Sequence, residues 1–285
     1  MRIVVTFLAA LTLVAQPAPA PPPDQRPVIA HESLLGTLWM QTSVEYHAVT
    51  RVVYRSAARQ LDAALADKTW TAAVEQTGDF HDKPPAVILD IDETVLDNTP
   101  YQARQVRHHR AFQPGEWRQW SSERKATAIA GADEFCRAAD SKGITVFYVS
   151  NRSDDATPAF TSERADTLQN LKDAGFPVRE ETLLLTNQAK GWTSDKTARR
   201  QFLAARYRIL MLFGDDLNDF IDVQSLNVDQ RTEKARRYED WWGERWFALP
   251  NPTYGSFERA LLVGVPNATA EQRKAAHESA LRLLE

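Results

Sequence analysis

Four short apolar runs, none of which alternates with polar positions, divide the sequence. They cover residues 86–90, 144–150, 182–186 and 208–215. Runs of this length without alternation are typical of strands that are buried on both faces. Helical patterns separate them, over residues 130–141, 162–174 and 197–206. Because strands and helices alternate, we predict an α/β fold with a mostly parallel sheet flanked by helices.

Apolar residues also recur at three- and four-residue steps from Ser33 to about Glu75, which predicts helical structure there. Gly78 and the Lys83-Pro84-Pro85 stretch end this pattern. We expect a mainly helical cap, built from this region and from an insertion around residues 100–125. The expected organisation is a helical N-terminal region, a core that carries the insertion, and a C-terminal helix, over residues 33–80, 81–265 and 266–285.

The sequence begins with Met1 and Arg2 and continues with an apolar run over residues 3–14, followed by small residues and prolines. A membrane span needs about 20 apolar residues, so this run is too short to cross a bilayer. We predict a signal peptide over residues 1–20, cleaved after about residue 15 to 20, and a proline-rich linker over residues 21–32. A buried N-terminal helix is the alternative. The signal predicts a secreted or periplasmic protein, and because no cysteine follows the run we expect no stable membrane anchor.

Composition narrows the range of functions. The chain has 285 residues, 43% of them hydrophobic, and a formal net charge of −4. This balance excludes collagen-like, rod-like and wholly disordered proteins, and the absence of excess basic charge argues against a nucleic-acid partner. The single cysteine, Cys136, excludes an intrachain disulfide, and its helical surroundings predict a buried thiol.

Acidic residues follow two of the predicted strands. Asp90 and Asp92 come at the end of the first strand, and residues two apart in an extended segment point the same way. Two carboxylates held close together repel unless a cation or a shared proton intervenes. Oxygen ligands suit Mg²⁺, which is therefore the expected cofactor. Asp215 and Asp219 form a second acidic group and would share a face if a helix starts there.

A hydroxyl and a lysine complete the candidate site. Ser150 ends the strand at 144–150, and Lys196 lies at the expected start of a helix. Such groups can hold the oxygens of a phosphoryl group. Each residue alone is more often a turn residue, a helix cap or a surface lysine. Asp90, Ser150 and Asp215 fall at the carboxyl ends of predicted strands, where ligands bind in open α/β sheets. This placement, together with the order of the residues along the chain, indicates a phosphate site.

In this order, the residues resemble the four motifs of the haloacid dehalogenase (HAD) phosphohydrolases. The similarity is closest to the class C (DDDD-type) acid phosphatases, which are secreted bacterial enzymes that include 5′-nucleotidases. The similar segments cover residues 38–46, 88–98, 147–152, 195–201, 214–220 and 249–255. The resemblance implies a HAD-like (Rossmannoid) parallel sheet with a mainly helical cap. Many members are lipoproteins, and this chain lacks their anchoring cysteine.

The resemblance also implies roles for individual residues. Asp90 would be the nucleophile that forms an aspartyl-phosphate. Asp92 would protonate the leaving group and then deprotonate the attacking water, from which we expect an acidic pH optimum. Mg²⁺ would be held by Asp90, the backbone carbonyl of Asp92, and Asp215. Ser150 and Lys196 would hold the phosphate oxygens.

Three further acid-motif residues receive minor roles by the same resemblance. Asp219 would lie outside the metal's ligands and orient Lys196 or a water on the metal. Thr94 would position the acid motif, and Asp216 is expected to matter least.

The substrate would be a small-molecule phosphate monoester, held on its far side by aromatic residues. In the family, aromatics before the second motif and after the fourth clamp a nucleoside, and Trp117 and Tyr254 match these places best. Trp120 is an alternative partner on the same helix face, and both tryptophans could instead be core residues of the cap. Asn151 is a further candidate for substrate binding. Trp241, Trp242 and Trp246 cluster at helical spacing, which indicates packing.

The sequence therefore favours a secreted, Mg²⁺-dependent nucleoside 5′-monophosphatase. A broad-specificity acid phosphatase or phosphotransferase without nucleotide preference is the alternative within enzymes. A non-catalytic secreted nucleotide-binding protein is the alternative outside them.

Overall fold

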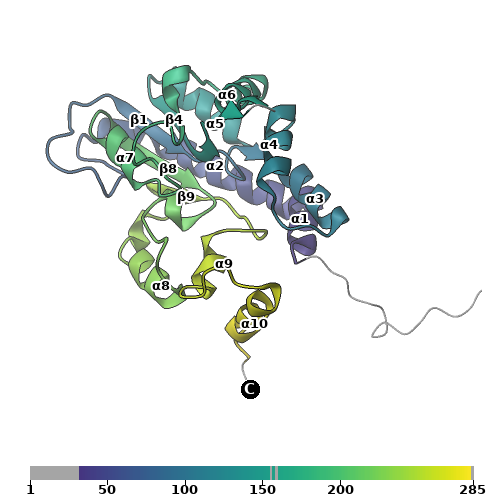
Figure 1. Cartoon of the computed structure of the whole chain (residues 1–285). Coiled ribbons are helices and arrows are strands. Elements are labelled where there is room, and N and C mark those ends of the chain that lie inside the picture. The colour runs from purple at the N-terminus through teal and green to yellow at the C-terminus, as the bar shows by residue number, and fades with distance from the viewer. Residues whose placement is uncertain (1–31, 155, 158–159, 284–285) are drawn as a thin grey trace, which may run out of the picture. The chain divides into compact units, whose positions relative to one another are not determined.

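The computed structural model describes residues 32–154, 156–157 and 160–283 (Figure 1). The predicted signal peptide and nearly all of the predicted linker lie outside the described residues. The helices are α1 (Leu34–Thr42), α2 (Val44–Ala66), α3 (Thr99–His108), α4 (Pro114–Glu123), α5 (Ala132–Ser141), α6 (Glu163–Asp173), α7 (Thr197–Ala204), α8 (Val228–Arg236), α9 (Ser256–Leu261) and α10 (Ala270–Ala280). Short 3₁₀ helices are η2 (Glu180–Thr182), η3 (Leu217–Asp219) and η4 (Glu239–Trp241). The strands are β1 (Pro85–Leu89), β2 (Leu96–Asp97), β3 (Thr127–Ala128), β4 (Thr145–Ser153), β5 (Ala156–Thr157), β6 (Phe160–Ser162), β7 (Leu183–Thr186), β8 (Arg208–Gly214) and β9 (Trp246–Ala248).

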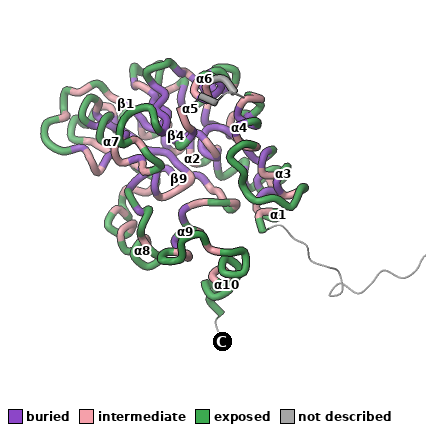
Figure 2. Tube along the Cα trace, in the orientation of Figure 1, coloured by how far each residue is buried: buried purple, intermediate pink, exposed green. Residues whose placement is uncertain are grey.

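The main sheet confirms the predicted α/β fold. Among the described residues its strands run in the order β7-β4-β1-β8-β9, and every neighbouring pair is parallel. Every position of β8 is buried, and buried segments mark the centre of Figure 2. Because the strands share one direction, their carboxyl ends meet at one edge of the sheet. The residues that follow β1, β4 and β8 therefore come together there.

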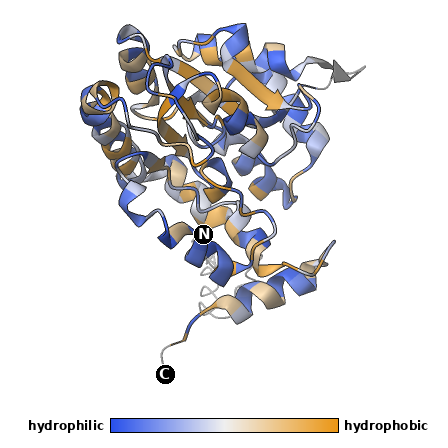
Figure 3. Ribbon diagram, turned by 90° about the vertical axis from the view of Figure 1, so that its left-hand side faces the viewer, coloured by the Kyte–Doolittle hydropathy of each residue, from blue (hydrophilic) through white to orange (hydrophobic). Residues whose placement is uncertain are grey.

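Both faces of the sheet are covered, as the unbroken apolar runs require. Val87 and Leu89 of β1 point into a hydrophobic cluster to which α2, α5 and α6 contribute. Ala86 and Ile88 point the opposite way, into a cluster that includes Leu203 of α7. Figure 3 shows the hydrophobic strands between helices whose outer faces are hydrophilic.

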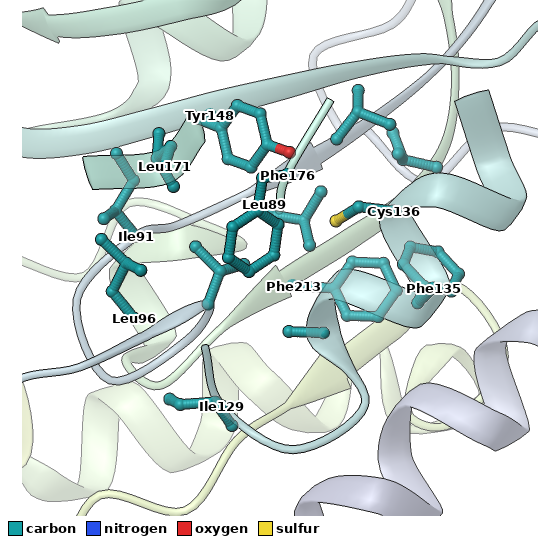
Figure 4. Packing of buried hydrophobic residues seen from close by; sticks show 14 of the residues in the cluster. Leu89, Ile91, Leu96, Ile129, Phe135, Cys136, Tyr148, Leu171, Phe176 and Phe213 are labelled. Atoms are coloured by element: carbon teal, nitrogen blue, oxygen red, sulfur yellow. The ribbon is translucent and has the colours of Figure 1, made fainter. Parts of the chain in front are cut away.

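The cluster under α5 contains the predicted buried thiol. Cys136 is fully buried, and the neighbouring Phe135 packs against Phe213 of β8 with ring centroids 4.6 Å apart (Figure 4). Tyr54 of α2 stacks on Phe213 at 5.5 Å, so α2 and α5 share one aromatic contact with the sheet. These contacts fix β8, and with it the acidic residues that follow the strand.

The N-terminal helical region is two helices rather than one. Ser43 has an extended backbone with a φ of −86° and a ψ of 137°, and its side chain accepts a hydrogen bond from the Tyr46 backbone N–H at 3.0 Å. Ser43 thus caps the start of α2, and α1 ends just before it. The helix also stops at Ala66, short of the predicted Glu75. α2 packs against α5 and β8, whereas α1 packs against α3, in the segment expected for the cap.

Helices α3 and α4 fill the segment expected for the cap insertion. They lie between β2 and β3, which pair antiparallel and close the insertion at its base. α4 also packs against α6, next to the end of β4. The insertion is therefore held close to the carboxyl edge of the sheet.

The tryptophan cluster near the C-terminus packs as predicted but does not lie on one helix. Trp246 is fully buried and starts β9, the edge strand that the sequence did not reveal. Its ring lies 5.2 Å from the rings of both Trp241 and Trp242, which approach it from η4 and the turn that follows. No helix within the described residues is long and apolar enough to cross a bilayer.

Candidate active site

Asp90 is placed by the extension of β1 beyond its last residue. Its backbone N–H donates to the carbonyl oxygen of Phe213 at 3.0 Å, so the pairing with β8 continues one residue further. The side chain is nearly buried at the carboxyl edge of the sheet. Burial raises the pKa of Asp90, and the nearby ammonium of Lys196 acts in the opposite direction.

Lys196 connects the two predicted acidic groups. Its Nζ contacts Oδ1 of Asp90 and lies 2.6 Å from Oδ1 of Asp219. Although burial alone would lower the pKa of Lys196, the carboxylates of Asp219 and Asp90 raise it. A lysine that is 4% exposed and paired in this way is not a surface residue. The structure thus brings together three residues that the sequence assigned to one site.

Asp219 reaches the site because the chain turns tightly after β8. It ends η3, and its Oδ2 accepts a hydrogen bond from the Asp216 backbone N–H at 3.0 Å. The turn is a 3₁₀ helix rather than the α-helix that the spacing suggested. Gly214 makes room for Asp219, since a Cβ at position 214 would lie 2.2 Å from Asp219 Oδ2. Only glycine is compatible with this packing.

Three carboxylates form a group that suits a hard divalent cation. Oxygens of Asp90, Asp215 and Asp219 all lie within 4.8 Å of one another. Burial raises the pKa of Asp215 well above its usual range, and the charges of Asp90 and Asp219 add to this effect. Asn251 orients Asp215 by donating to Oδ2 at 2.8 Å. Lys196 can balance only part of this buried negative charge, and oxygen ligands are those that Mg²⁺ and related ions prefer.

The Asp92 carboxylate lies outside this group. It is held by donors from two other segments. Arg152 Nη2 donates to Oδ1 at 2.7 Å, and Asn98 Nδ2 donates to the same oxygen at 2.9 Å. Ser150 Oγ donates to Oδ2 at 3.3 Å. The side chain is therefore fixed in orientation but separate from Lys196 and Asp219.

Arg152 is the main residue of the site that the sequence analysis did not assign. It is buried two residues after Ser150 on β4, and residues two apart on a strand point to the same side. That spacing is the signal that could have identified it. Its Nη1 also donates to Thr167 of α6 at 3.1 Å, so it joins Asp92 to the helix beside the cap.

A second buried arginine, Arg199 of α7, was also missed. It donates to the backbone carbonyl of Ser150 and to Asn151 Oδ1, the latter at 2.7 Å. Asn151 in turn donates to the Ser194 carbonyl at 3.1 Å. Burial lowers the pKa of Arg199 to about 10. Asn151, expected as a substrate ligand, is exposed, and both ends of its amide bind the protein.

Two further acid-motif residues, Thr94 and Asp216, lie beside the carboxylate group. Thr94 Oγ1 lies between the carboxylates of Asp90 and Asp215, at 3.5 and 3.4 Å. Asp216 caps η3 through the backbone N–H of Asn218 at 2.9 Å and binds Ser256 of α9. Asp216 thus has a structural position beside the site.

The aromatic candidates differ in exposure. Tyr254 is 36% exposed, and its hydroxyl donates to Glu93. Trp117 is half-buried against Tyr101, with ring centroids 5.2 Å apart. Trp120 is 2% exposed and belongs to the hydrophobic core, where Nε1 donates to Asn98 at 2.8 Å. The expectation that Trp120 could stack on a base therefore needs correction, because its ring is covered.

Phe112 is an aromatic residue near Trp117 that the sequence analysis overlooked. It is 60% exposed, and its ring centroid lies 6.4 Å from that of Trp117. Arg152 approaches the same tryptophan, with its guanidinium 5.4 Å from the ring. Trp117 thus stands between an exposed aromatic residue and a residue that holds Asp92.

Known proteins resemble this chain in sequence and fold. A family model described as HAD superfamily, subfamily IIIB (acid phosphatase), matches residues 29–257. The class C acid phosphatase from Bacillus anthracis has a similar structure, with a TM-score of 0.76 and 31% identity over 89% of this chain and 98% of that chain.

Two plant proteins are more distant relatives. The stem 31 kDa glycoprotein of Glycine max is 28% identical over 59% of this chain, and acid phosphatase 1 of Solanum lycopersicum is 26% identical over 59%. The matches span 58% and 57% of these relatives, which is less than two thirds of their length.

Proposed function

The chain belongs to the acid phosphatase family of HAD subfamily IIIB, and from this premise we propose that it is a secreted, Mg²⁺-dependent phosphatase of nucleoside 5′-monophosphates. The observation that carries the proposal is the contact of Lys196 with both Asp90 and Asp219, beside Asp215 at one edge of the sheet. This grouping supplies a nucleophile, a cation for phosphate oxygens and a place for a metal ion.

Asp90 is the proposed nucleophile. A carboxylate oxygen attacks phosphorus, the bond from phosphorus to the ester oxygen breaks, and an aspartyl-phosphate forms. Lys196 and Ser150 bind the oxygens of the transferred group, and Lys196 offsets the charge that Asp90 and the phosphate bring together. Water then attacks phosphorus, releases inorganic phosphate and restores the Asp90 carboxylate.

Asp92 is the proposed proton carrier. Its proton moves to the ester oxygen as that oxygen leaves, and the resulting carboxylate later takes a proton from the attacking water. Arg152 and Asn98 hold the carboxylate in a fixed orientation, which this two-way transfer requires.

Mg²⁺ is the proposed metal, held by Asp90, Asp215 and the backbone carbonyl of Asp92. When bound, such an ion offsets negative charge on the phosphate oxygens and on the carboxylates around them. Asp219 supports the site by holding Lys196.

The nucleotide preference rests on the aromatic residues at the edge of the site. Trp117 and Tyr254 are both partly exposed, so their faces can contact a base, and each stacked base contributes about 1–3 kcal/mol. A phosphatase without such a preference would use the same Asp90 chemistry. Export is proposed from the apolar run and small residues at the N-terminus.

The proposal is tested by phosphate release from adenosine 5′-monophosphate at mildly acidic pH. The chain is expressed with its N-terminal region, and the purified protein is assayed with Mg²⁺, with EDTA, and with Mg²⁺ restored. We expect turnover that EDTA abolishes and Mg²⁺ restores. Binding of the nucleotide without turnover under all three conditions would instead support a binding protein.

A further inference from the structure

Glu93 has no assigned part in the reaction, yet it is completely buried next to Asp92. Its backbone has a φ of 56°, in the left-handed region that residues other than glycine seldom adopt. The backbone N–H donates to the Leu96 carbonyl at 2.9 Å, which closes the turn after Asp92. A strained conformation of this kind persists only when surrounding contacts fix it.

Both oxygens of the Glu93 carboxylate have specific partners. Oε1 accepts a hydrogen bond from the Asn98 backbone N–H at 2.8 Å, and Oε2 accepts one from the Tyr254 hydroxyl. Asn98 also donates from its side chain to Asp92 at 2.9 Å. The turn that carries the proton carrier thus binds Tyr254 through Glu93, although 161 positions separate the two in sequence.

Tyr254 is held through its hydroxyl by a residue that lies far from its own part of the chain. It lies in the irregular segment between β9 and α9, and its ring is partly exposed while its hydroxyl is tied to Glu93. A phenol held at its hydroxyl keeps the long axis of its ring in place, whereas an unanchored ring on a loop samples several χ1 rotamers. The bond to Glu93 therefore decides where the ring lies relative to a ligand.

We propose that Glu93 is a positioning residue that fixes the Tyr254 ring beside the leaving group, and that it thereby sets the preference for phosphate esters with an aromatic base. This inference rests on the proposed phosphatase function. Glu93 acts through Tyr254 and touches neither the phosphate nor the reacting atoms. Its removal weakens binding of the aromatic part more than it slows the chemical step.

The test is a double-mutant cycle of Glu93→Gln and Tyr254→Phe. For wild type, both single variants and the double variant, KM and kcat are measured with adenosine 5′-monophosphate and with glycerol 2-phosphate, which has no aromatic group. We expect each single variant to raise the KM ratio of nucleotide to glycerol 2-phosphate about tenfold, the size of one buried hydrogen bond. Tyr254→Phe removes the bond and Glu93→Gln replaces its carboxyl acceptor by an amide, so both changes act on one interaction and we expect the double variant to show the same ratio as Tyr254→Phe alone.

Tyr238→Phe serves as the matched control, because Tyr238 packs against Trp241 and Trp246 away from the site. The control should leave the KM ratio at the wild-type value. If Glu93→Gln does not fold, the KM ratio of Tyr254→Phe alone tests the inference. This variant is expected to fold, since it removes only a hydroxyl from a partly exposed ring. An unchanged KM ratio in Tyr254→Phe would overturn the inference. A double variant in which the change in KM ratio equals the product of the two single-variant changes would overturn it as well. Absence of wild-type turnover on both esters would instead overturn the proposed function.

Discussion

Arg152 and Asp92 face one another through three hydrogen bonds. Arg152 Nη2 and Nε donate to Asp92 Oδ1 at 2.7 and 3.1 Å, and Nε also donates to Oδ2 at 3.2 Å. The arginine is buried and binds Ser121 of α4 and Thr167 of α6 through Nη1. The proposed proton carrier is therefore fixed by a residue that is itself anchored in the cap and in the core.

Replacement of Arg152 by Gln should lower kcat about 100-fold, because the proton carrier then loses the contacts that orient it. Steady-state kinetics with adenosine 5′-monophosphate measure the change, and a thermal melt shows whether the variant is folded. Arg124→Gln is the matched control, since Arg124 pairs with Asp166 at 2.7 Å and does not contact Asp92. A kcat for Arg152→Gln equal to that of the control would show that Asp92 needs no such support.

Replacement of Gly214 by Ala should damage both the fold and the site. The added Cβ would lie 2.2 Å from Asp219 Oδ2, so Asp219 must move away from Lys196. Overpacking of this kind costs about 1–3 kcal/mol of stability, and we expect phosphatase activity to fall with it. Urea unfolding and phosphate release measure the two effects.

Gly115→Ala is the control for this substitution. Gly115 lies in α4, and a Cβ there would meet no atom within 4 Å. Alanine at that position should be neutral or slightly stabilising, since it favours the helix. Full activity in Gly214→Ala would contradict the packing described for Asp219.

The metal-free protein should be more stable at pH 5 than at pH 8. Burial raises the pKa of Glu93 from its usual 4.5 to about 8, and burial also raises the pKa of Asp215. The folded protein therefore holds protons that the unfolded chain would release. For Glu93 this contribution is complete below about pH 4.5 and is lost as the pH rises through about 8.

Melting temperatures in EDTA across this range measure the effect, and Mg²⁺ should raise the melting temperature more at pH 8 than at pH 5. At a concentration 100 times its dissociation constant, a bound ion adds about 2.7 kcal/mol. If Mg²⁺ raised the melting temperature equally at pH 5 and pH 8, the result would contradict a buried carboxylate site for the ion. A metal-free protein that is more stable at pH 8 than at pH 5 would contradict it as well.

Trp117 and Trp120 should respond differently to replacement by Ala. Trp117 is half-buried, so its loss should raise KM for adenosine 5′-monophosphate relative to glycerol 2-phosphate about tenfold with a small effect on folding. Trp120 is buried and donates to Asn98, so its loss should cost about 3–5 kcal/mol of stability. Steady-state kinetics and unfolding curves of the two variants check this. A large loss of stability in Trp117→Ala together with a raised KM in Trp120→Ala would contradict the prediction.

Trp117 and Trp120 also show which features the sequence predicts and which it does not. Apolar runs that end in Asp90, Ser150 and Asp215 identify the strands and the edge at which they meet, because burial on both faces leaves a simple pattern. Helical spacing placed Trp117 and Trp120 on one face, but exposure depends on how α4 packs against α6, which spacing does not encode.

Arg152, Arg199 and Glu93 were missed for a related physical reason. A buried charged residue has no signature of its own in a sequence, because its burial is acceptable only when partners from distant segments reach it. Arg199 illustrates this, since its acceptors come from β4 and from the loop before α7. Ser43 is different, because a serine before the Val44–Ala66 helix is a recognisable cap, and apolar periodicity on both sides concealed it.

Asp90 is proposed to form the bond to phosphorus, and trapping of the intermediate tests this directly. Wild type and Asp90→Asn are mixed with a phosphate ester and Mg²⁺, quenched in acid within milliseconds, and examined by peptide mass spectrometry. We expect a phosphoryl group on the wild-type peptide that contains Asp90, and neither that adduct nor turnover in Asp90→Asn. Turnover that survives in Asp90→Asn, or an adduct on another residue, would contradict it.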